Sequence, residues 1–375
     1  MRVVRKFVEL LRLGLRSRFR AARLRRFIGV FARGGDREST ADALGELARA
    51  DRAGGFTSDA LRRALQAAQL LADEETGEAG VRALLHLGSL CLDTGAPDSA
   101  ASAAELARER AAALPEPART ELSAGAMLLL GIAQSQEGDD EARASLAEAR
   151  DLLIAARKPA GAALALVQQG LLDIATERSD GAELCFLYAR DFYRNAQLPL
   201  ASVEVAAVAA RAFAEVDLWK NAERWFVTSI GEADLIGATQ LAAELAIEHA
   251  AELDRAGHPS ETLRVANDGA RRCARLGTDE VSAELRASVR LQLARLVEDP
   301  REALQHLEAV FELALARRDG ATLGGALDVL VSGLVKDRFA VGTWRLVERF
   351  RDLLTGAAFD ALAATAEIAL ADLRR

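Results

Sequence analysis

The sequence contains few of the residues that cross-link chains or bind metals. Its 375 residues include three cysteines, four histidines and seven prolines, and only 5% are aromatic. Cys91, Cys185 and Cys273 are odd in number and lie about ninety residues apart, so we expect neither a disulfide framework nor a zinc site. This use of cysteine is typical of a reducing compartment, and we predict a cytoplasmic protein.

Motifs for catalysis and for membrane insertion are also missing. The sequence has no Walker-type phosphate loop, no dinucleotide fingerprint, no HExxH helix and no GxSxG turn. No apolar run approaches the roughly 18 residues that a membrane span needs, and Arg25-Arg26 are followed by no apolar signal region. The four histidines are isolated from one another and from cysteine. The sequence therefore predicts no catalytic residue, no metal and no cofactor.

The residues that are abundant favour helix. Half of the chain is apolar, alanine and leucine supply most of that half, and no segment alternates strictly enough to predict a strand. A chain of 375 residues is long for one hydrophobic core, which indicates several domains or an array of repeats. Arginine outnumbers lysine by 44 to four, a bias that indicates a GC-rich bacterial source.

One stretch, residues 84–107, has the pattern of two consecutive helices. A turn at Gly95 and Pro97 separates its halves, and residues of defined size recur at helical spacing on both sides. These are Leu84, Leu87, Gly88 and Cys91 before the turn, and Ala100, Ala104 and Ala107 after it. The arrangement resembles the tetratricopeptide repeat, in which a small residue at the position of Ala100 lets the two helices approach closely.

The same pattern recurs when each second helix is aligned on the small residue that follows the turn. The aligned residues, called anchors below, are Ala60, Ala100, Ala142, Ala182, Ala222, Thr262, Ala303 and Thr343, at intervals of 40 to 42 residues. Residues that end one helix and cap the next, mainly glycine, proline, serine and aspartate, precede most of them. We therefore predict eight helix–turn–helix units with helices of about 15 residues.

A period of 40 exceeds the family's usual length of about 34 and resembles its long-helix members, such as kinesin light chains and MalT-type bacterial regulators. A HEAT-like or armadillo-like array, with repeats of roughly 40 to 47 residues, remains an alternative. The Leu87-Gly88 and Leu130-Gly131 pairs favour the first interpretation. The predicted fold is all-α, a right-handed superhelical solenoid of about eight tetratricopeptide-like repeats over residues 35–375, with a capping helix at about 357–375.

The resemblance implies a function in binding. In such arrays the first helix of each repeat lines a groove, and the polar candidates at those positions are Ser89, Arg211, Ser288 and Gln292. Their neighbours are mostly apolar, and no set of lysine, asparagine and arginine suited to a C-terminal carboxylate accompanies them. We predict a non-enzymatic scaffold or adaptor that binds a peptide or protein partner. A ligand- or peptide-responsive regulator of a partner protein, and self-association, remain alternatives.

Residues 1–34 differ from the rest of the chain in charge. Ten arginines and Lys6 oppose Glu9 alone, so this segment carries +10 and the other residues −18 of the total of −8. The spacing of its apolar residues predicts a basic amphipathic helix. Its candidate contact residues are Arg2, Arg5, Lys6, Phe7, Leu11, Arg12 and Arg16.

Three roles for residues 1–34 remain open. The apolar face caps the first repeat, or the segment binds the anionic inner surface of a membrane as a peripheral anchor, or it docks on an acidic partner. Nucleic acid is disfavoured as a partner because the chain's isoelectric point is near 5.3 and the acidic remainder repels a polyanion.

Overall fold

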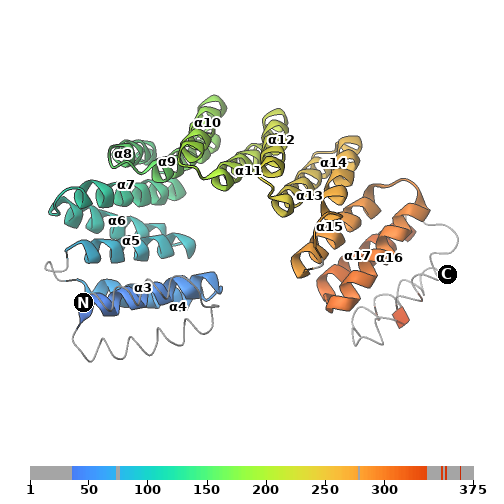
Figure 1. The fold of residues 1–375 in the computed structure, drawn as a ribbon, viewed down its shortest axis with the longest axis horizontal. Helices are drawn as coiled ribbons and strands as arrows, with labels where there is room; N and C mark the ends of the chain where they lie inside the picture. The colour runs from blue at the N-terminus through green and yellow to red at the C-terminus, as the bar shows by residue number, and fades with distance from the viewer. Residues whose placement is uncertain are drawn as a thin grey trace. The chain divides into compact units, whose positions relative to one another are not determined.

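The computed structural model describes residues 36–72, 77–277 and 279–335, together with the single positions 348, 351, 352 and 364. Within these residues the chain forms fifteen α-helices and no strand (Figure 1). The bounds are α3 Arg37–Ala53, α4 Thr57–Leu70, α5 Gly77–Asp93, α6 Pro97–Ala112, α7 Ala118–Glu137, α8 Ala142–Ala155, α9 Pro159–Ala175, α10 Ser179–Asn195, α11 Pro199–Glu215, α12 Trp219–Leu235, α13 Thr239–Arg255, α14 Pro259–Cys273, α15 Glu280–Leu296, α16 Pro300–Arg317 and α17 Gly320–Val335. The predicted all-α array of repeats is confirmed for this part of the chain.

The helices belong to two compact units, unit 1 with α3–α10 and unit 2 with α11–α17. Within each unit, consecutive helices are joined by short turns and pack against each other as antiparallel neighbours (Figure 1). Among the described helices, substantial contacts join only those that are adjacent or next but one in the chain. Each unit is therefore a stack of helix pairs, in which a pair buries its apolar faces against the pairs on either side.

The predicted repeat register is confirmed by the position of the anchors. Six of them, Ala60, Ala100, Ala182, Ala222, Thr262 and Ala303, are the fourth residues of α4, α6, α10, α12, α14 and α16, and Ala142 is the first residue of α8. None of these seven side chains is more than 1% exposed. Thr343, the eighth anchor, lies outside the described residues.

The first and second helices of a pair meet at glycines of the first helix. A Cβ atom added to Gly131 would lie 2.7 Å from Cγ of Leu146, and one added to Gly170 would lie 2.9 Å from the ring of Phe186. Leu146 and Phe186 stand four residues after their anchors and are fully buried. The glycine of the Leu130-Gly131 pair is thus required by close packing between the two helices.

The 40-residue period comes from helices longer than the predicted 15 residues. From α9 to α14 the helices begin every 20 residues, and five of these six helices contain 17 residues, separated by connections of three. Two such helices and two such connections make one repeat. The extra length relative to the usual repeat therefore lies in both helices and not in the turns.

The three-residue connections share one backbone geometry. Their second residues, Arg157, Glu177, Gln197, Asp217, Gly237 and Gly257, all have φ between 55° and 79°. The third residue donates its N–H to a carbonyl of the preceding helix, as in the bond of 2.7 Å from Arg178 to Asp173 and that of 2.9 Å from Leu218 to Phe213. This is the Schellman arrangement, which ends a helix and lets the next begin within one residue.

Several predictions concern residues outside the described part of the chain. They are the amphipathic segment 1–34, its separation from the repeats at residue 35, and the capping helix at 357–375, of which only position 364 is described. The handedness of the superhelix likewise stays a prediction. Among the described residues, no helix is both long and apolar enough to cross a membrane.

Candidate functional site

In both units the first helices of successive pairs lie side by side. α3 contacts α5, α5 contacts α7 and α7 contacts α9 in unit 1, while α13 contacts α15 and α15 contacts α17 in unit 2. α11 is joined to α13 by side chains, through the Arg211–Glu248 ion pair and the bond from Arg255 to the carbonyl of Ala214. Successive second helices make no comparable contacts within the described residues. The exposed sides of the first helices therefore form one continuous surface in each unit, which we call its inner face.

Arg211 connects two first helices of unit 2. Its guanidinium on α11 forms a two-bond ion pair with the carboxylate of Glu248 on α13, with 2.7 Å between Nη2 and Oε2. The hydrogen bonds that Arg211 donates to Glu248 raise the pKa of Arg211. This predicted groove residue is therefore a structural link, although 47% of its side chain remains exposed.

Gln292 makes the next link along the same face. Its Nε2 donates a hydrogen bond of 3.0 Å to the backbone carbonyl of Ile247 on α13. Ser288, one helical turn earlier on α15, is exposed. Three of the four predicted groove residues, Arg211, Ser288 and Gln292, thus lie on the inner face of unit 2.

A small cavity adjoins Gln292 between α13, α14 and α15. Its volume is about 220 Å³, and its polar lining residues are Asp254, Arg255, Thr262, Gln292 and Arg295. Arg255 is already engaged, because it forms an ion pair of 2.5 Å with Glu252 and donates to the carbonyl of Ala214.

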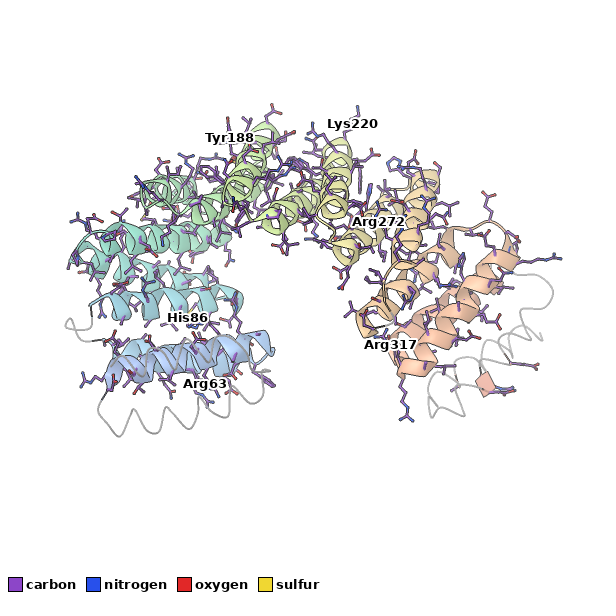
Figure 2. The ribbon with its side chains drawn as sticks, in the orientation of Figure 1. Arg63, His86, Tyr188, Lys220, Arg272 and Arg317 are labelled. Carbon is purple, nitrogen blue, oxygen red and sulfur yellow. The ribbon has the colours of Figure 1, made fainter. Side chains whose placement is uncertain are left out.

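Ser89, the fourth predicted groove residue, lies in unit 1 within a cluster of charged side chains on α3 and α5. Its hydroxyl accepts a bond of 3.4 Å from Arg52, which also pairs with Asp93 at 2.6 Å. His86 lies beside them on the side of α5 that faces α3 (Figure 2). Burial and then the nearby Arg49 and Arg52 lower the pKa of His86. The four candidates therefore belong to two different units, Ser89 to unit 1 and the other three to unit 2.

Buried polar pairs between the helices of a repeat were not anticipated from the sequence. Arg63 on α4 pairs with Asp51 on α3, and both side chains are nearly enclosed. Ser145 on α8 donates a bond of 2.7 Å to Gln134 on α7. Asp173, only 2% exposed, accepts from Arg143 and from the thiol of Cys185. The sequence contained a signal for three of these pairs. In each of them the residue on the second helix, which is Arg63, Ser145 or Cys185, follows its partner on the first helix by 11 or 12 positions.

The cysteines serve as packing residues. Cys91 and Cys273 are buried, Cys185 is partly buried, and burial raises the thiol pKa of all three. Among the described residues, no group of histidine, cysteine, aspartate and glutamate side chains is arranged to hold a metal ion.

A row of glutamates on unit 2 was also missed. Glu204, Glu244 and Glu284 follow one another at intervals of 40 residues on α11, α13 and α15. Each lies one or two helical turns before an inner-face residue, namely Arg211, Glu248 and Ser288, and so shares its face. The equal spacing in the sequence is the signal that would have revealed this row.

Acid sensitivity is expected from His249. Its ring is 1% exposed and stacks on Phe226 with centroids 4.8 Å apart, and burial, followed by the charge of Arg264, lowers its pKa to about 4. Between pH 6.5 and 4 the unfolded chain binds a proton that the folded chain does not. Stability should therefore fall by about 1.4 kcal/mol per pH unit in this window and be unaffected by this group above it.

Urea titrations between pH 7.5 and 4.5 measure this effect, with His249→Leu as the comparison. The variant should lose less stability on acidification than the wild type. It should keep some sensitivity, because burial also lowers the pKa of His86 and His306. Identical pH dependence of the two proteins would contradict the assignment.

The sequence matches no protein-family model and no curated protein. Solved structures with a similar arrangement include a signal transduction ATPase with a tetratricopeptide repeat sensor from Pyrococcus horikoshii, 13% identical, with a TM-score of 0.49 over 86% of this chain and 50% of that one. Yeast Tom70 is 14% identical, with a TM-score of 0.24 over 94% and 96% of the two chains. The tetratricopeptide repeat domain of P58(IPK) is 15% identical, with a TM-score of 0.25 over 99% of each. The chain spans about half the length of the first of these.

Proposed function

We propose that this chain is a non-enzymatic scaffold that binds a peptide or protein partner on the inner faces of its two units. One observation carries the proposal: the first helices lie side by side and leave polar and apolar side chains of successive repeats on one surface. Stacked helical repeats generally use such extended surfaces for binding. The basic residues of segment 1–34 provide a second attachment point, on an acidic surface.

The chemistry of the inner faces suits an amphipathic peptide. In unit 1, Leu128 on α7 and Leu164 and Gln168 on α9 are at least partly exposed, and the charged cluster of α3 and α5 lies on the same inner face. In unit 2, apolar Val208, Ile247 and Leu291 lie half-buried among charged groups. A ligand that inserts apolar anchors and places charges around them would match both surfaces.

Site-specific crosslinking tests where the partner binds. A photo-crosslinking amino acid at Gln168 places the probe on the inner face of unit 1, and the same probe at Leu184, 53% exposed on the second helix α10, serves as the matched control. In cells that contain the natural partner, Gln168 should yield a discrete crosslinked species that Leu184 does not. Equal products at the two positions, or none at Gln168, would contradict an inner-face binding site.

A further inference from the structure

We infer that the inner face of unit 2 binds the arginine-rich segment 1–34 of a second copy of this chain. The inference rests on the proposed function and deepens it, because it names the occupant of one of the two inner faces. The charge of that face, the spacing of its carboxylates and its apolar residues each support this occupant.

The inner face of unit 2 is acidic. Glu204 is exposed, and no ion pair of this residue is found in the described part of the chain. Glu244 accepts a bond of 2.9 Å from Gln240, and Glu284 lies 3.7 Å from Arg317 on α16, so neither charge is cancelled by a close partner on the face itself. With Glu248 and Glu252, five carboxylates on α11, α13 and α15 stand against Arg211, Arg255 and Arg295, and two of these arginines already pair with Glu248 and Glu252.

The spacing of the carboxylates matches the spacing of arginines in a helix. Packed helices lie about 8 to 10 Å apart, so Glu244 and Glu284 on the packed helices α13 and α15 repeat at about that distance. Seven residues of α-helix span about 10.5 Å. Pairs of arginines seven residues apart recur in segment 1–34, at positions 5 and 12, 16 and 23, 18 and 25, and 26 and 33.

The apolar residues of the two surfaces are also complementary. Val208, Ile247 and Leu291 are half-buried on the same sides of α11, α13 and α15 as the charged row. On a helical wheel of segment 1–34, Arg5 and Arg12 border the apolar face formed by residues such as Phe7 and Leu11. A helix that inserts this apolar face can therefore extend those arginines to the glutamates at its edge.

A second copy is the source of the segment for two reasons. The segment ends two residues before Asp36, which caps α3 in unit 1, so it is covalently attached to the unit that does not carry this face. The charges also attract between copies, because one molecule's segment carries +10 and the remainder of another carries −18. Binding of this kind is head-to-tail, so it produces oligomers whose size depends on concentration.

Sedimentation equilibrium of the full-length protein tests the inference. The wild type should self-associate near physiological ionic strength and dissociate at about 1 M salt, where charges are screened within a few ångströms. The triple variant Glu204→Lys, Glu244→Lys, Glu284→Lys should associate at least roughly tenfold more weakly. A matched control places the same three changes on exposed residues of the second helices, Glu223→Lys, Glu261→Lys and Glu302→Lys, and should associate like the wild type.

Mixing two variants shows whether weak association comes from lost charge pairing or from a damaged fold. The variant Arg5→Glu, Arg12→Glu should also associate weakly, but its mixture with the inner-face lysine variant should form a mixed complex. A wild type that is monomeric at all concentrations, an inner-face variant that associates normally, or a mixture that stays dissociated would overturn the inference. Binding of the wild type to vesicles of anionic lipid without self-association would overturn it in favour of a membrane surface.

Crosslinking from Ser288 shows whether the inference fails alone or together with the proposed function. A photo-crosslinker at this exposed inner-face position should capture residues 1–34 of a second copy. Capture of a foreign protein alone would overturn the inference and leave the scaffold proposal standing. No product from either Ser288 or Gln168 would contradict both.

Discussion

Replacement of Ala142 by tryptophan is expected to destabilise the protein by about 3 kcal/mol or more. Ala142 is completely buried at the start of α8, where α7 and α8 approach closely enough that even a Cβ atom on Gly131 would clash with Leu146. A large ring in this position must separate the two helices, and the apolar faces of the flanking pairs would lose contact with them. Thermal unfolding followed by circular dichroism should show a transition several degrees lower.

The same helix offers the control. Ala144 is exposed two residues further along α8, so Ala144→Trp adds the same ring to solvent and should change stability by less than about 0.5 kcal/mol. Ala222→Trp, at the completely buried anchor of α12, should behave like Ala142→Trp. Equal melting temperatures for Ala142→Trp and Ala144→Trp would show that the repeat register is wrong.

Removal of the Asp51 carboxylate is expected to cost about 3 to 5 kcal/mol. Asp51 and Arg63 pair between α3 and α4, with only 9% and 12% of their side chains exposed. In Asp51→Ala the guanidinium stays enclosed without its carboxylate. Urea unfolding of wild type and variant measures the loss directly.

Two comparisons separate this effect from the loss of any ion pair. Asp59 and Arg62 form a pair on the surface of α4, with 45% and 64% exposed, so Asp59→Ala should cost less than about 1 kcal/mol. The double variant Asp51→Leu, Arg63→Met should regain most of the stability lost in Asp51→Ala, because it removes both buried charges. A double variant as unstable as the single one would argue that the pair specifies the packing of α3 on α4.

The repeat fold was predictable from the sequence because close packing leaves a periodic signal. Two helices can touch only where a small residue stands, and the chain places one at every anchor from Ala60 to Ala303. The turn residues limit each helix independently of the anchors. Helix length was less accessible, because the connections at Glu177, Gln197 and Asp217 adopt a left-handed conformation with residues other than glycine.

The candidate site was only partly predictable. A polar residue on a first helix can either bond to the neighbouring helix or stay exposed for a partner, and the sequence does not distinguish these two roles. Arg211 holds α11 to α13 and Gln292 holds α15 to α13, whereas Ser288 is exposed. The pairing depends on which side chains meet across neighbouring helices, and repeats that differ at those positions give no common motif. For the same reason Ser89 was grouped with residues that belong to another unit.

The restriction of contacts to neighbouring helices has a consequence during synthesis. Among the described residues, α3 to α6 make substantial contacts with no helix beyond α7, so their main partners exist once the ribosome has added Glu137, while α8–α17 are still to be made. N-terminal parts of a chain generally fold first as it emerges. The apolar surface that the growing chain exposes at any moment is thus that of its last one or two helices, whatever the final number of repeats.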